Sequence, residues 1–146
     1  MTVIAMTQEM ATLGTDVAQG IAQALGLKIV QHEVGDTVAE RMQVKHSLIR
    51  RVREGQAGWL EKRSVDPEVF AVYAAEEVLT LAAEGNIVLR GWGARCILKG
   101  VSHIPCIRVC APLEQRVHWL MKRLDTDDAD LARGEIERSD AAHIAR

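Results

Sequence analysis

The chain has 146 residues, of which 48% are hydrophobic and 26% charged, and its formal net charge is −2. This length fits one domain with an adequate core, and the near-neutral charge excludes a global field that would recruit nucleic acid or a membrane. No apolar run approaches the roughly 18 residues of a membrane span, and the polar residues 7–9 interrupt the N-terminus too early for a signal peptide. We therefore expect a cytoplasmic protein that binds neither nucleic acid nor a membrane.

The N-terminal stretch predicts a strand, a loop and a helix in that order. Residues 3–6 form a short apolar run, and apolar residues then recur every four positions over about residues 15–25. Gly26 follows as a natural helix C-cap. Because the helix comes after the strand and the loop of residues 8–14, its free N–H groups and its dipole point at the space above the strand end. This arrangement suits a phosphate.

The middle of the chain predicts a second strand at residues 27–31 and a helical segment at 32–55 with a break near Val44. Asp66-Pro67-Glu68 is a helix start, with Asp as the N-cap and Pro at the first helical position, and this helix should stop at Gly85. A third strand follows at residues 86–90, and the glycines of Gly91-Trp92-Gly93 end it sharply.

The C-terminal part predicts a strand at residues 104–110, a helix from Pro112 to about Leu124, an acidic turn, and a charged helix at 129–146. The last helix has only a thin apolar stripe, so we expect it to be loosely attached or to need a partner surface. The element order predicts an α/β fold with a mostly parallel sheet and flanking helices. Ligands bind beyond the carboxyl ends of such strands, where three loops should converge: residues 8–14, the turn after Val30, and residues 91–95.

The cysteines are Cys96, Cys106 and Cys110. An odd count without a CxxC pair argues against disulfides and structural zinc. Cys106 and Cys110 lie in a strand-like run, which favours buried apolar thiols. His103 and Cys106 alone are too few ligands for a metal, so no metal site is expected.

The loop after the first strand departs from a full phosphate-binding loop, which reads GxxxxGK[ST]. Residues 9–16 read EMATLGTD, where only Gly14 is in place, and residues 1–27 hold no lysine or arginine. An ordinary strand-to-helix turn and a degenerate phosphate loop both fit this pattern. Arg95 is equally open between phosphate recognition at a strand end and a surface position, and residues 50, 51 and 53 are typical of a solvated helix face.

Three blocks of the chain resemble the cytidylate kinase-like branch of the P-loop nucleoside monophosphate kinases. They are TQEMATLGTDVA, NIVLRGWGARCIL, and IRVCAPLEQRVHWLMKRL followed by EIERSDAAH. The resemblance covers nearly the whole chain. It implies one P-loop NTPase-like domain over residues 1–146, with an acceptor-covering helical segment at 32–64 and a lid-like helix at 125–146, and a sheet without the family's last strand and helix.

The resemblance implies phosphoryl transfer from Mg-ATP to CMP or a similar monophosphate, with nucleotides as partners and ATP and Mg²⁺ as cofactors. By this analogy the ATP phosphates lie at Ala11, Thr12, Leu13, Gly14, Thr15 and Asp16. The acceptor candidates are Arg41, Arg50, Arg51 and Arg95. The candidates on the lid side are Arg116, Arg123, Arg133 and Arg138; the resemblance assigns no catalytic residue and no metal ligand.

Three departures from the family bear on activity. Ala11 stands where the family has a loop glycine, Thr15 where it has Lys or Arg, and Trp92 replaces the arginine of a Gly-Arg-Gly turn. Since losing one preorganised donor typically reduces the rate about 10²–10³-fold, we expect reduced activity and an anion cradle that no nearby cation completes. The alternatives are a non-catalytic nucleotide-binding or regulatory module, or a chain that folds only with a partner, and an open sheet edge would allow a homo-oligomer.

Overall fold

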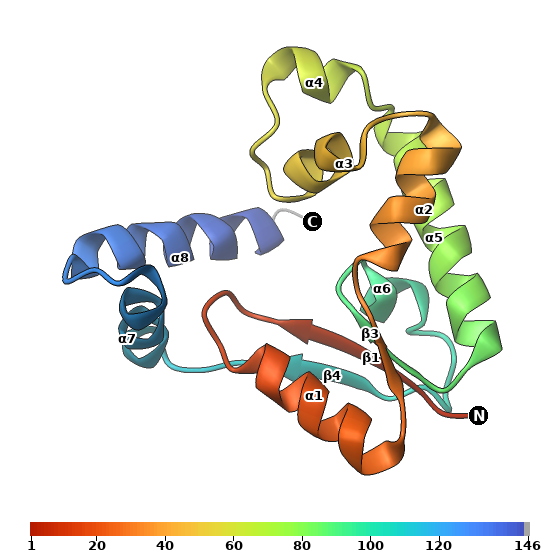
Figure 1. The fold of residues 1–146 in the computed structure, drawn as a ribbon, viewed down its shortest axis with the longest axis horizontal. Coiled ribbons are helices and arrows are strands. Elements are labelled where there is room, and N and C mark those ends of the chain that lie inside the picture. Colours follow the sequence, from red (N-terminus) through yellow and green to blue (C-terminus); the bar gives the residue numbers. More distant parts are fainter. Residues whose placement is uncertain (145–146) are drawn as a thin grey trace.

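A four-stranded parallel sheet forms the centre of the computed structural model, which describes residues 1–144 (Figure 1). The strands lie in the order β2 (Lys28–Val30), β3 (Ile87–Arg90), β1 (Val3–Gln8) and β4 (Cys106–Val109). Met6 of β1 pairs with Arg90 of β3 and with Ile107 of β4. The predicted α/β fold with flanking helices is therefore confirmed.

Helices cover both faces of the sheet, as Figure 1 shows. Side chains alternate along a strand, so Ile4 and Met6 of β1 pack against α1 (Gly14–Leu25), while Val3 and Ala5 join the cluster formed with α2 (Glu33–Met42) and α5 (Pro67–Glu84). A strand buried on both faces reads as a continuous apolar run. This burial explains why the opening of the chain is apolar at every position from 3 to 6.

The predicted helix signals in the middle of the chain are confirmed. Asp66 accepts backbone hydrogen bonds from Glu68 at 2.9 Å and Val69 at 3.3 Å, which caps α5. The break near residue 44 separates α2 from α3 (His46–Arg53). Two short helices, α4 (Trp59–Arg63) and α6 (Ala94–Ile97), were not expected, because four or five residues are too few to show a helical period.

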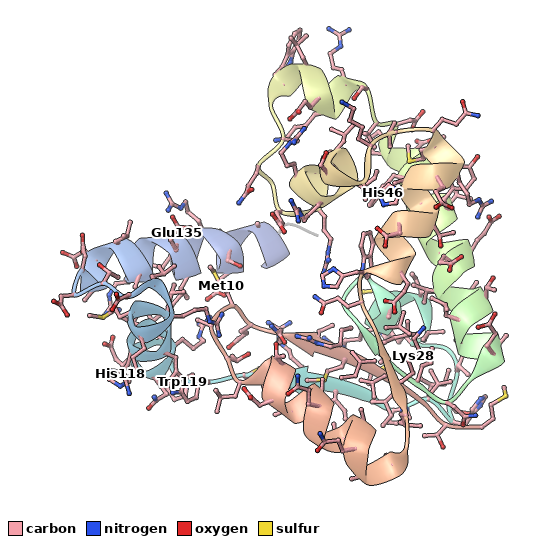
Figure 2. The ribbon with its side chains drawn as sticks, in the orientation of Figure 1. Met10, Lys28, His46, His118, Trp119 and Glu135 are labelled. Atoms are coloured by element: carbon pink, nitrogen blue, oxygen red, sulfur yellow. The ribbon has the colours of Figure 1, made fainter. Side chains whose placement is uncertain are left out.

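The charged C-terminal helix α8 (Ala129–Ile144) packs on α7 (Leu113–Leu124). Its thin apolar stripe is buried at Ala132 and Ile136, which have no exposed surface, whereas Leu131 is 48% exposed. Met10 lies below α8 near the end of β1 and packs against the same cluster (Figure 2). The partner surface that this helix needs is thus supplied by the same chain; residues 145 and 146 of the predicted lid-like helix lie outside the described residues. No helix in the described range is long and apolar enough to cross a bilayer.

The expectation of buried thiols at Cys106 and Cys110 is wrong, because all three cysteines are exposed. The reason is the place of β4 at the edge of the sheet. Ile107 and Val109 alternate onto the face that α1 covers, whereas Cys106 and Cys110 belong to the opposite set, which is exposed at this edge.

We therefore expect all three thiols to react rapidly with a thiol-specific reagent in the native protein, because none is shielded by packing. Titration with and without denaturant measures this directly. A native protein in which only one thiol reacts, with the others released by unfolding, would contradict the exposed positions of Cys106 and Cys110.

Candidate functional site

The loop between β1 and α1 leaves a row of backbone N–H groups available. Within the described chain, the N–H groups of residues 13–16 donate to no other group, and the start of α1 has no side-chain cap. Thr12 stabilises the loop by donating its hydroxyl to the Glu9 carbonyl at 2.8 Å. Free amides and the positive end of a helix dipole are together suited to an anion.

Ala11 adopts the backbone conformation of the glycine expected at this position. Its φ is +61°, in the left-handed region that costs a residue with a Cβ roughly 1–2 kcal/mol. Its methyl group is buried in the cluster formed with α7 and α8, which offsets part of that strain. The turn of a glycine-containing loop is therefore retained without the glycine.

A cation does lie at this helix start, so the expectation that none is nearby is wrong. Arg90, the last residue of β3, donates from Nη2 to the Thr15 hydroxyl at 3.1 Å and to Gln8 Oε1 at 2.6 Å. Its Nη1 donates to Gln31 Oε1 at 2.9 Å. The residue comes from far along the chain, and it reaches the loop because β3 and β1 are neighbours in the sheet.

Above these strand ends lies a cavity of about 420 Å³, which we call the arginine cavity. Among its described lining residues there are four arginines and no carboxylate, so the cavity attracts anions. Burial lowers the pKa of the Arg90 guanidinium from its ordinary value, although an arginine remains charged under all ordinary conditions. The lining residues are Thr7, Gln8, Met10, Gln31, Arg53, Arg90, Gly91, Trp92, Gly93, Arg95, Cys96, Arg108 and Ser139.

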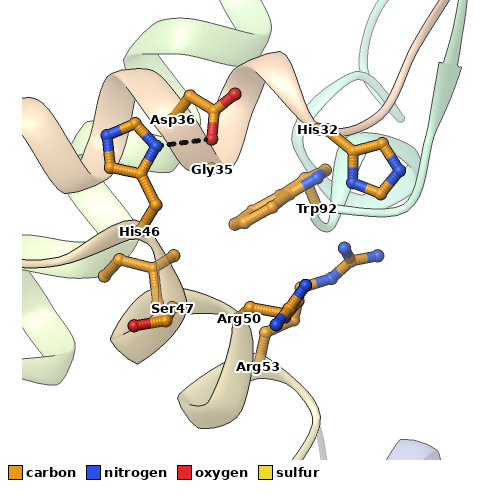
Figure 3. Close-up of a pocket in the computed structure, with 9 residues that line it drawn as sticks. His32, Gly35, Asp36, His46, Ser47, Arg50, Arg53 and Trp92 are labelled. Carbon is orange, nitrogen blue, oxygen red and sulfur yellow. Dashed lines mark hydrogen bonds and ion pairs between the residues drawn. The ribbon is translucent and has the colours of Figure 1, made fainter.

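A second cavity of about 380 Å³, the tryptophan cavity, adjoins the first at Trp92 and Arg53, which line both (Figure 3). Its other lining residues come from α2, α3 and the turn before α2; they are His32, Gly35, Asp36, His46, Ser47, Ile49 and Arg50. His46 Nδ1 and Asp36 Oδ1 lie 2.9 Å apart. This cavity therefore combines the Trp92 ring, the guanidinium groups of two arginines and the hydrogen-bonding pair of His46 and Asp36. Such a set of groups is suited to a ligand with a planar polar ring and a negative charge.

Trp92 is held rigidly between the two cavities. Its indole N–H donates to the Gln31 carbonyl, and the Arg53 guanidinium lies 4.5 Å from the ring centroid. The ring lies against Gly35 (Figure 3), where a Cβ would come within 2.8 Å of it. Trp92 is therefore a fixed wall of both cavities.

The acceptor candidates fall into two groups. Arg95 lines the arginine cavity and Arg50 the tryptophan cavity. Arg41 instead pairs with Glu76 at 2.6 Å, and Arg51 pairs with Glu61. Neither Arg41 nor Arg51 lines either cavity in the described part of the chain.

The lid-side candidates lie away from both cavities. Arg116 is buried between α7 and α8 and donates to both carboxylate oxygens of Asp140, at 3.0 and 2.8 Å. The other three are Arg133, which pairs with Glu114 at 2.7 Å; Arg138, which pairs with Glu135; and Arg123, which is exposed on α7. The contribution of α8 to the arginine cavity is Ser139.

Arg53, Arg90 and Arg108 line the arginine cavity but were not predicted from the sequence to do so. Arg90 and Arg108 lie at or near the carboxyl ends of strands, and that position is the signal that could have identified them. Arg108 also lies 3.5 Å from Glu9, and the Cys110 thiol and then Glu9 raise the pKa of its guanidinium.

The chain is similar to known proteins in sequence and in fold. The model of the family described as "Cytidylate kinase-like family" matches residues 3–146. Among solved structures, the chain is similar to an uncharacterized protein from Eubacterium ventriosum ATCC 27560, with a TM-score of 0.69 and 17% identity over 97% of this chain and 73% of the other.

Two shikimate kinases are also similar. The one from Acinetobacter baumannii, in complex with shikimate, has a TM-score of 0.51 and 11% identity over 94% of this chain and 75% of its own. The one from Bacteroides thetaiotaomicron has a TM-score of 0.53 and 17% identity over 94% of this chain and 76% of its own. No curated protein matches the chain by sequence. At these identities the solved structures show a shared fold.

Proposed function

The chain belongs to the cytidylate kinase-like family, and from this premise we propose that it transfers the γ-phosphoryl group of Mg-ATP to CMP or a similar nucleoside monophosphate, with reduced activity. The observation that carries the proposal is the arginine cavity, which is lined by four guanidinium groups and, among the described residues, by no carboxylate. One of these groups, that of Arg90, also contacts Thr15 at the start of α1. Phosphoryl transfer depends mainly on positioning and on neutralising phosphate charge, and this cavity supplies both.

In this proposal the ATP phosphates lie over the backbone of residues 11–16. The free N–H groups donate to phosphate oxygens, and Thr12 keeps the loop in shape through its hydrogen bond to Glu9. Thr15, which stands where the family has a cation, supplies a neutral hydroxyl that Arg90 already contacts.

The residues at the start of α1 also fit Mg²⁺. Among the residues that the structure describes, no three His, Cys, Asp or Glu side chains gather into a metal site. Mg²⁺ commonly binds through one or two carboxylates together with substrate phosphates and water, and Asp16 is an exposed carboxylate in the first turn of α1. Asp16 would hold the ion, which when bound neutralises charge on the phosphate oxygens.

The acceptor nucleotide is proposed to occupy the tryptophan cavity, with its base against Trp92 and its phosphate toward the shared wall at Arg53. Arg50 and Arg95 lie on the two sides of this wall. For Arg41 or Arg51 to take part, each would first have to leave its carboxylate partner. Arg116, Arg123, Arg133 and Arg138 would reach a phosphate only after α7 and α8 move.

The direct test is a coupled assay of ADP release with CMP, dCMP, UMP and AMP as acceptors. We expect slow but measurable turnover with at least one of them. A folded protein that turns over none of the four would remove the kinase proposal.

Cys96 provides a second, binding-only test, because it is exposed and lines the arginine cavity. We expect saturating Mg-ATP to slow alkylation of Cys96 at least several-fold, since the nucleotide would cover the thiol. Cys106 is equally exposed but lines neither cavity, so it serves as an internal control in the same sample. Peptide mass spectrometry measures both rates, and equal protection of the two thiols would argue against nucleotide in this cavity.

A non-catalytic nucleotide-binding or regulatory module is the second candidate function. The observation that favours it is the side chain of Gln8, which lies so close to Gly14 that a Cβ there would be 1.9 Å from Gln8 Oε1. A neutral amide thus covers part of the helix start. Calorimetry with ATP, CMP and Mg²⁺ distinguishes the two, because tight binding without turnover fits only the module.

Self-association is a further part of the proposal. Among the described residues β4 pairs only with β1, so its outer edge has no strand partner. A melting temperature that rises with protein concentration would support a homo-oligomer through this edge. The cytoplasmic location stays a prediction from the sequence.

A further inference from the structure

The Arg90 guanidinium is held in place by hydrogen bonds and still has unused N–H donors. Three of its N–H groups are used by Gln8, Thr15 and Gln31. A guanidinium has five N–H donors, so the N–H on Nε and the second one on Nη1 have no acceptor among the described residues. These hydrogen bonds hold the planar group at the second residue of α1, beside the free amides of the loop.

The charge of Arg90 also lacks a counter-ion. All three of its acceptors are neutral, and no carboxylate in the described part of the chain pairs with it. Other arginines of the chain differ, since Arg108 and Arg116 each contact a carboxylate. A half-buried charge with no counter-ion is unfavourable, and an anion in the arginine cavity would relieve that cost.

We propose that Arg90 supplies, from the neighbouring strand, the positive charge that residue 15 lacks, and that it contacts the phosphates of the nucleotide donor. The inference rests on the proposed function. Thr15 occupies the position of the expected lysine or arginine, and the Arg90 guanidinium lies 3.1 Å from its hydroxyl. A positive charge is therefore present at nearly the expected place, but residue 90 carries it instead of residue 15.

Calorimetric titrations with Mg-ATP and with inorganic tripolyphosphate test the inference. Arg90→Gln should weaken both by about tenfold or more, the effect of losing one hydrogen-bonded charge, whereas weak binding of adenosine, which has no phosphate, should not change. Arg63→Gln is the matched control: it removes the same charge from α4, where Arg63 stacks over Trp59 and lines neither cavity. The control should bind both polyphosphates as the unmodified protein does.

Two further variants separate charge from packing. Arg90→Lys retains the charge and should retain most of the affinity, and it also covers the case in which Arg90→Gln does not fold. Adding Thr15→Lys to Arg90→Gln should recover most of the lost affinity, because it returns the charge to residue 15.

The failures of the two proposals are distinguishable. If the unmodified protein binds neither Mg-ATP nor tripolyphosphate, the proposed function is overturned together with the inference. If it binds them and Arg90→Gln binds equally well, only the inference is overturned. The inference is also overturned if Arg90→Lys loses as much affinity as Arg90→Gln and if adding Thr15→Lys to Arg90→Gln recovers none of it. The positive charge would then not be the cause of the lost affinity.

Discussion

Replacing Arg116 with alanine is expected to lower the free energy of unfolding by about 2 kcal/mol, the contribution of hydrogen bonds between charged groups. The Arg116 side chain is only 7% exposed and donates two hydrogen bonds to Asp140. The hydrogen bonds to Asp140 raise the pKa of the guanidinium, and the negative charge of Glu9 adds to that shift. The substitution leaves both carboxylates without this partner where α7 meets α8. Urea denaturation should show a lower midpoint with an unchanged m value.

Arg133→Ala is the matched control for this prediction. Arg133 joins the same two helices through Glu114, but the two side chains are 36% and 77% exposed. Exposed pairs contribute roughly 0–1 kcal/mol, so the change in stability should be at most about 1 kcal/mol. Equal losses in both variants would contradict the distinction between a buried and an exposed pair. An Arg116→Ala variant with unchanged stability but impaired turnover would instead support the lid role implied by the family resemblance.

Replacing Gly14 with alanine is expected to destabilise the protein by about 1–3 kcal/mol, the range for overpacking, and to weaken Mg-ATP binding. An added Cβ would lie 1.9 Å from Gln8 Oε1 and 2.8 Å from Gln8 Cβ. The whole Gln8 side chain would therefore have to move, which breaks its hydrogen bond to Arg90. Thermal melts with and without Mg-ATP measure both effects.

Gly20→Ala makes the same chemical change on the same helix without the contact. Gly20 is exposed and a Cβ there would meet no atom within 4 Å. Alanine is the better helix former, so this control should gain up to about 1 kcal/mol. Truncating the obstructing side chain by adding Gln8→Ala to Gly14→Ala should restore part of the stability. Similar melting temperatures for the two glycine variants would contradict this prediction, because they would show that the Gln8 side chain moves without a loss of stability.

Much of the fold follows from local signals in the sequence. The Asp66-Pro67 start of α5 and the Gly26 end of α1 depend on residues next to one another, and hydrophobic periodicity locates the long helices and the strands. The convergence of three loops at one end of the sheet also follows, because parallel strands connected by helices bring their carboxyl ends to the same edge. The arginine cavity includes residues from all three loops.

The sequence by itself therefore determined the class of fold, the family and the end of the sheet at which the three loops converge, since each depends on short-range pattern and element order. The tertiary structure alone decided which side chains meet there. Arg90 reaches Thr15, 75 positions earlier, because β3 lies beside β1, and Cys106 is exposed because β4 lies at the sheet edge. Hydrophobic periodicity predicts which face of a helix or strand is apolar, but not which other element will pack beside it. The pairing of charged side chains and the exposure of residues at strand ends depend on the order of the strands in the sheet, which no local sequence pattern encodes.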